Sequence, residues 1–249
     1  MDFSSIFPWI DYDPDMEDEP VRWLIDGIWQ LGKINGMAGF EKSGKSRLLC
    51  WLLAGMYAGK VFSRAALPRK VGYLCGEETI PTANSRLKRY AKLLDVEAFM
   101  DIKFMNAPAM GLESKQRRHE LLKSLLEAKR DMLVIDPLRR VHNADEDKST
   151  VMSPIYNDIR QWSNKYNMTI VLLHHTPKID VLTDMTRIAS WFRGSTDLAA
   201  ILDTAQYVDR QSKKRIQVLR EGRFPPMDPL SIEDLGGRDV NDDRGFRLL

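Results

Sequence analysis

The segment that most restricts the fold of this chain is the run Gly39-Phe40-Glu41-Lys42-Ser43-Gly44-Lys45-Ser46. It fits the pattern G-x-x-x-x-G-K-[ST] at every required position; an apolar run at 34–38 precedes it, and the helix expected at 47–59 follows. A strand, a glycine-rich turn and a helix in this order predict a loop whose backbone N–H groups surround phosphate groups, aided by the positive end of the helix. The sequence therefore predicts a nucleotide site.

Each part of this loop has an expected contact. Lys45 should reach the β- and γ-phosphates, and the Ser46 hydroxyl should ligate Mg²⁺. Glu41 is unusual in such a loop and is expected to point away from the phosphate charge. The residues predicted to bind the nucleotide are Gly39, Phe40, Glu41, Lys42, Ser43, Gly44, Lys45, Ser46, Arg47 and, from a later strand, Asp136.

Short apolar strands alternate with amphipathic helices along most of the chain. After a hairpin and strand within 23–37, strands are expected at 70–75, 101–105, 132–135 and 168–173, and helices at 81–94, 113–129 and 151–166. Short strands at 206–209 and 215–219 indicate an antiparallel extension. We therefore predict an α/β fold with a central, mostly parallel sheet, helices on both faces and a C-terminal antiparallel extension.

Polar residues follow three of the expected strands. Asp136 ends one strand, where it can hold the Mg²⁺ shell through water. Glu77, at the end of another, can polarise the attacking water, although one carboxylate of the pair Glu77 and Glu78 is also suited to the N-terminus of the next helix. His174 ends a third strand and can sense the γ-phosphate, with a purely structural role as the alternative.

The length and charge of the chain limit its class. A chain of 249 residues forms one large domain or two small ones, and its net charge is only +2. Residues 1–20 carry seven acidic side chains and no Lys or Arg, so the remainder carries +9. We divide the chain into an acidic N-terminal arm (1–20), an ATPase domain (21–224) and a C-terminal tail (225–249). The tail is rich in Pro, Gly and Asp and is expected to be loosely packed or to dock on the domain.

Other classes of protein find little support. Cys50 and Cys75 lack the spacing of a zinc site and suggest a reducing compartment. The longest apolar stretch, 48–59, is shorter than the ~20 residues that span a bilayer, and no secretory signal is readable. We expect a cytoplasmic protein without a membrane partner.

Five segments together resemble a known family. GFEKSGKS, YLCGEE, MLVIDPLRR, IVLLHHTPK and RGSTDLAAILD resemble the RecA-fold ATPases and, within them, the plasmid RepA-type hexameric replicative helicases, from about Trp23 to Val218. The resemblance implies that Lys45 and Ser46 bind ATP and Mg²⁺, and that Asp136 is the second acid. It also implies that Glu77 is the catalytic base and that His174 is the γ-phosphate sensor. Arg193 would be an arginine finger for the ATP of the neighbouring subunit, and Arg223 is a second candidate for that finger.

The resemblance implies an ATP-dependent DNA helicase or translocase of plasmid- or phage-type replication that works as a hexameric ring. Loops 137–150 and 176–192, which carry Arg139, Arg140, Lys178 and Arg187, should contact single-stranded DNA. Arg139 and Arg140 are also suited to surface ion pairs with the acidic run at 145–147. The alternatives are a RecA-like recombination or annealing ATPase, which forms filaments, and a nucleotide-switched loader that unwinds nothing.

Overall fold

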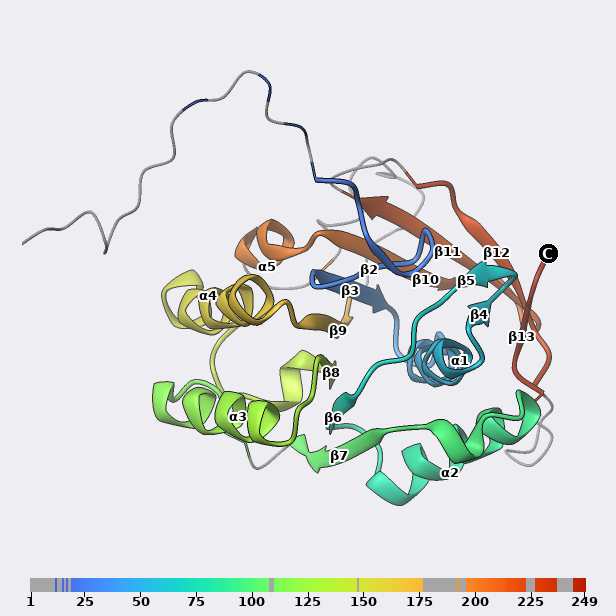
Figure 1. Cartoon of the computed structure of the whole chain (residues 1–249), viewed down its shortest axis with the longest axis horizontal. Helices are drawn as coiled ribbons and strands as arrows, with labels where there is room; N and C mark the ends of the chain where they lie inside the picture. The colour runs from blue at the N-terminus through green and yellow to red at the C-terminus, as the bar shows by residue number, and fades with distance from the viewer. Residues whose placement is uncertain are drawn as a thin grey trace, which may run out of the picture.

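The structure is a computed structural model that describes residues 12, 15, 17, 19–107, 110–146, 148–176, 192, 196–222, 227–236 and 244–249. Its centre is a nine-stranded sheet in the order β13-β12-β11-β10-β3-β9-β8-β6-β7 (Figure 1). The parallel strands are β3 (Ile34–Gly39), β6 (Val71–Cys75), β7 (Ile102–Asn106), β8 (Met132–Asp136), β9 (Thr169–His175) and β10 (Thr204–Arg210). The antiparallel strands at the other edge are β11 (Arg215–Gly222), β12 (Leu230–Asp234) and β13 (Phe246–Leu248).

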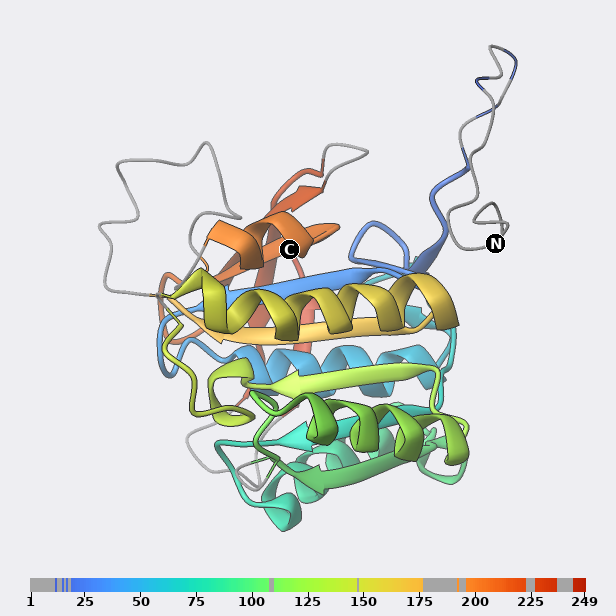
Figure 2. The same cartoon turned by 90° about the vertical axis from the view of Figure 1, so that its left-hand side faces the viewer.

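Helices cover both faces of the sheet. One face carries α1 (Lys45–Tyr57) and α2 (Ile80–Leu93). The other carries α3 (Lys115–Glu127), α4 (Ser149–Tyr166) and α5 (Thr196–Ile201), and Figure 2 shows α3 and α4 side by side across it. Two short hairpins, β1 (Trp23–Ile25) with β2 (Trp29–Gln30) and β4 (Lys60–Val61) with β5 (Arg64–Ala65), and the 3₁₀ turns η2 (Glu97–Phe99) and η4 (Leu138–Arg140) complete the fold.

The sheet is buried on both faces, which explains its apolar strands. In β8, Leu133 and Ile135 pack in the core beneath α3 and α4, while Val134 packs in the core beneath α1 and α2. A strand whose successive side chains pack in two different cores needs apolar residues at successive positions. The predicted fold class is thereby confirmed.

Of the two alternatives for the C-terminal tail, loose packing is wrong for residues 227–236 and 244–249, which dock on the edge of the sheet. β12 pairs with β11, placing Leu230 opposite Val218, and β13 pairs with β12. Leu230, Ile232 and Phe246 are buried. The apolar pattern of these strands is too short to be recognised locally, and they are ordered by the edge of β11, which offers unpaired backbone groups.

The parallel strands place their carboxyl ends at one edge of the sheet. Gly39 is in register with His175, and Cys75 with Asp136. Residues far apart in the sequence therefore meet where α/β folds bind their ligands. Within the described residues, no helix is long and apolar enough to cross a membrane.

Candidate active site

The predicted phosphate loop connects β3 to α1. Gly44 precedes α1 with φ of 99°, and a Cβ atom there would lie 2.7 Å from the guanidinium of Arg210. Only glycine fits this conformation and this contact without strain. Because α1 begins at Lys45, the positive end of its dipole lies at the loop.

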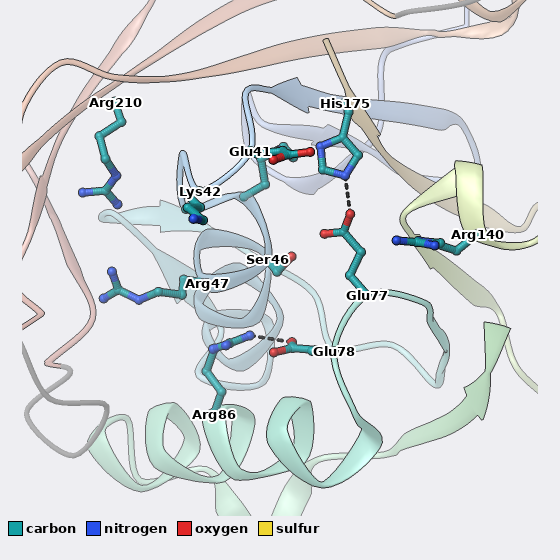
Figure 3. A pocket seen from close by; sticks show the side chains of 12 residues that line it. Glu41, Lys42, Ser46, Arg47, Glu77, Glu78, Arg86, Arg140, His175 and Arg210 are labelled. Carbon is teal, nitrogen blue, oxygen red and sulfur yellow. Dashed lines mark hydrogen bonds and ion pairs between the residues drawn. The ribbon is translucent and has the colours of Figure 1, made fainter. Parts of the chain in front are cut away.

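A cavity of about 640 Å³ opens beside the loop (Figure 3). Its lining residues are Glu41, Lys42, Gly44, Lys45, Ser46, Arg47, Glu77, Glu78, Arg86, Arg140, His175 and Arg210. Of the other predicted loop residues, Phe40 packs edge-to-face with Tyr207, and Ser43 is buried. Glu41 does not point away as expected, because it lines the cavity and its charge acts on Lys45.

Lys45 is folded back onto the loop. Its Nζ donates hydrogen bonds of 2.8 Å to the carbonyl oxygens of Gly39 and Phe40. Burial lowers the pKa of Lys45, and the charges of Glu77, Asp136 and Glu41 oppose this effect. The ammonium group is therefore removed from water and lies near three carboxylates. It can attract a phosphate only while it keeps its proton and its positive charge.

Asp136 and Ser46 lie together, as predicted from the sequence. Ser46 Oγ donates to Asp136 Oδ1 at 3.3 Å, and the Tyr73 hydroxyl donates to Asp136 Oδ2 at 2.7 Å. Burial raises the pKa of Asp136 to about 6, although both hydrogen bonds act to lower it. A hydroxyl and a carboxylate are ligands of the kind that Mg²⁺ takes from proteins when phosphate oxygens and water complete its shell. The residues present thus fit this ion.

The two glutamates after β6 have different partners (Figure 3). Glu77 Oε1 is hydrogen-bonded to Nε2 of His175, and this bond lowers the pKa of Glu77 against the effect of burial. Glu78 Oε1 accepts a 2.5 Å bond from Arg86. Glu77, the base expected from the sequence, thus lies in the cavity beside a histidine, whereas Glu78 is paired with an arginine of α2.

The two histidines at the end of β9 face opposite sides. His175 lines the cavity, whereas His174 is 1% exposed and its ring stacks on Phe192 with a centroid distance of 6.2 Å. The sequence assigned the sensor to His174, but the structure places His175 beside the cavity. Successive strand residues alternate between faces, and the sequence alone does not indicate which of the two points inward.

Several cations of the cavity were not predicted as nucleotide contacts. Arg86 comes from α2, Arg210 from the end of β10, and Arg140 from η4 in the loop expected to bind DNA. Arg86 and Arg210 lie in no motif, and Arg140 ends the segment MLVIDPLRR, which gave no sign of a place in the cavity. Arg193, Arg223 and most of loop 176–192, including Lys178 and Arg187, lie outside the described residues.

The chain matches an AAA domain family over residues 4–180 and belongs to it. Together with the fold and the phosphate loop, this membership defines a P-loop ATPase of RecA-like architecture. No curated protein matches the chain. Among solved structures, its fold is similar to that of a KaiC-like protein from the hyperthermophilic archaeon Pyrococcus horikoshii, with a TM-score of 0.58 and 12% identity over 92% of this chain and 100% of that chain. At this identity the likeness concerns the fold.

Proposed function

We propose that this chain is an ATP-dependent DNA translocase of the helicase type, which hydrolyses ATP at subunit interfaces and moves on single-stranded DNA. One observation carries the proposal: Arg140 lines the nucleotide cavity, while the adjacent Arg139 has a half-exposed side chain on the same loop. The loop that is expected to contact DNA thus begins inside the nucleotide site.

The arrangement of the cavity suits hydrolysis of a nucleoside triphosphate. Phosphates bound by the loop would compete with the carbonyl groups of Gly39 and Phe40 for the ammonium of Lys45. Glu77 would accept the proton of the attacking water, and His175 would hold the Glu77 carboxylate in place. Mg²⁺, held by Ser46 and through water by Asp136, would neutralise the charge on the β- and γ-phosphates.

The end of β9 offers a route from hydrolysis to the DNA loop. His175 lines the nucleotide cavity, and β9 also packs against η4 at the start of the DNA loop. On the other side of the strand from His175, His174 is one of the groups that lower the pKa of Glu146 against the effect of burial. Glu146 Oε1 lies 3.5 Å from Nε2 of the buried His142 in the same loop. If β9 shifts when the γ-phosphate is lost, the packed side chains would therefore transmit this movement to loop 137–150.

Arg139 provides the test of DNA contact. The alternative that the sequence offers is an ion pair with the acidic run, and within the described residues Arg139 makes a 4.0 Å contact to Glu146. A contact of this kind to a half-exposed arginine contributes little. We expect Arg139→Ala to weaken stimulation of ATPase activity by single-stranded DNA and to lower the salt dependence of DNA binding by about 0.7 in slope for one lost phosphate contact.

The control is Lys123→Ala, which removes an exposed cation from α3. It should leave DNA stimulation and the salt slope unchanged. Absence of any DNA stimulation in the unsubstituted protein would refute the proposal. ATPase activity without strand displacement on a forked substrate would favour a loader, and filaments seen by electron microscopy would favour a recombination-type ATPase.

A further inference from the structure

One buried carboxylate connects the C-terminal strands to the nucleotide cavity. Asp234 ends β12 and is 3% exposed. Its two oxygens accept bidentate hydrogen bonds from Arg47, at 2.7 Å from Nη1 and 3.0 Å from Nη2. Arg47 directly follows the magnesium-binding serine of the phosphate loop, so β12 is fixed to the first turn of α1.

The same carboxylate reaches the loop by a second route. Arg210 Nη2 donates to Asp234 Oδ2 at 2.7 Å, and its Nε donates to the carbonyl oxygen of Ser43 at 3.1 Å. The Arg210 guanidinium also lies where a Cβ of Gly44 would be. A chain of hydrogen bonds therefore runs from β12 through Arg210 to the backbone of the phosphate loop itself.

Asp234 is well suited to remain charged in this position. Burial acts to raise the pKa of Asp234, but the hydrogen bonds from Arg47 and Arg210 outweigh it, and the pKa is lowered. The backbone N–H of Gly236 donates a third contact at 3.0 Å, and Arg47 lies over the ring of Phe246 from β13, 5.1 Å from its centroid. Charge-assisted and bidentate bonds of this kind fix geometry more firmly than neutral ones.

We propose that Asp234 is a positioning residue of the nucleotide site, which holds Arg47 and Arg210 so that the phosphate loop keeps the shape that binds phosphate. The C-terminal strands then support the phosphate-binding shape of the loop through Asp234. This inference rests on the nucleotide binding in the proposed function and is independent of DNA contact.

The test compares ATP and ADP affinity, KM and kcat among four variants of the full chain. Asp234→Asn removes the charge, Asp234→Glu keeps a carboxylate, and Arg210→Lys keeps the positive charge but loses the forked geometry. Glu233→Gln is the matched control, since it removes a carboxylate from the adjacent position, where the side chain pairs with the exposed Arg247.

We expect Asp234→Asn and Arg210→Lys to weaken binding of ATP and ADP by about tenfold each, because the loop backbone surrounds phosphates common to both nucleotides. KM should rise far more than kcat falls, Asp234→Glu should recover part of the affinity, and Glu233→Gln should match the unsubstituted protein. A merely structural role would change thermal stability without this split between KM and kcat.

The outcomes separate the two ideas. If the unsubstituted protein binds no nucleotide, the proposed function fails. If it binds ATP and loses binding in Lys45→Ala, while folded Arg210→Lys and Asp234→Asn bind ATP as tightly as the unsubstituted protein, the positioning role of Asp234 is wrong and the proposed function stands. Should Asp234→Asn fail to fold, Asp234→Glu decides between these results, because Asp234 does not line the cavity whereas Arg210 does: nucleotide affinity equal to that of the unsubstituted protein would overturn the positioning role.

Discussion

At the scale of single residues, the site depends on which of two adjacent side chains faces the cavity. Glu77 is bonded to His175, whereas Glu78 is paired with Arg86. The Glu77 side chain is 40% exposed in the cavity and has a histidine as its partner, whereas the Glu78 side chain is 19% exposed and is paired with an arginine. Two chemically identical residues thus acquire different roles from their neighbours.

Glu77→Gln and Glu78→Gln form a matched pair of variants. We expect Glu77→Gln to bind ATP normally but to lower kcat by about 10²- to 10⁴-fold, because the general base is lost. Glu78→Gln should have a much smaller effect on kcat. Steady-state turnover and nucleotide affinity measured on both proteins test this, and a larger loss of kcat in Glu78→Gln would contradict the assignment.

The contact with His175 predicts a pH effect. The hydrogen bond from His175 lowers the pKa of Glu77. As the pH falls, the carboxylate therefore stays deprotonated, and able to act as a base, down to a lower pH than it would without this bond. In His175→Ala this bond is lost while the burial remains, so the pKa of Glu77 should rise. The acidic limb of the profile of kcat/KM against pH should therefore move to higher pH. His119→Ala, on the exposed face of α3, is the control, and an unmoved acidic limb would argue against the role of His175.

At the scale of elements, α4 shows how amphipathic spacing becomes burial. The expected stripe consists of Val151, Ile155, Ile159, Trp162 and Tyr166. Its three central members are buried, and the two outer ones are 39% and 37% exposed. The middle turns of the helix therefore pack in the core, and the stripe becomes partly exposed to solvent at both ends.

Ile159→Ala and Tyr166→Ala should differ in their effect on stability. Ile159 is fully buried, so its truncation leaves a cavity and should lower the free energy of unfolding by about 2–5 kcal/mol. Tyr166 is partly exposed at the last turn, so its truncation should lower the free energy of unfolding by less than about 1 kcal/mol. Urea denaturation followed by circular dichroism measures both, and equal losses would show that the packing of α4 is described wrongly.

At the scale of the whole molecule, the ring of subunits remains a prediction. The resemblance assigns Arg193 to the ATP of a neighbouring subunit, with Arg223 as the second candidate. Both residues lie outside the described part of the chain. The cavity described above is lined by the candidate base Glu77, by Ser46 of the candidate magnesium site and by the phosphate loop. We therefore expect a neighbouring subunit to supply only the arginine finger.

Mixed oligomers test this arrangement. Lys45→Ala and Arg193→Ala should each abolish ATPase activity, whereas a mixture should regain part of it, because a Lys45→Ala subunit still offers its Arg193 to an intact site next door. The mass of the protein in solution with an ATP analogue and single-stranded DNA should rise to that of a hexamer. Arg117→Ala, an exposed residue of α3, is the control. Full turnover by Arg193→Ala alone, or by a monomer, would exclude the trans contact.

The sequence by itself determined the phosphate loop, the order of strands and helices, and the strand-end positions of Asp136 and Glu77. These features are local: they depend on the spacing of glycines, on apolar periodicity and on the rule that parallel strands end at one edge. A reader of the sequence needs no knowledge of distant contacts to find them.

Only the tertiary structure decided that His175 and not His174 faces the cavity, and that Asp234 binds Arg47 and Arg210 beside it. β9 is buried on both faces, so its sequence carries no alternation from which the direction of either histidine could be read. Asp234 contacts Arg47 across 187 positions of sequence. A contact of that separation arises from the order of strands in the folded sheet, and no pattern near either residue encodes it.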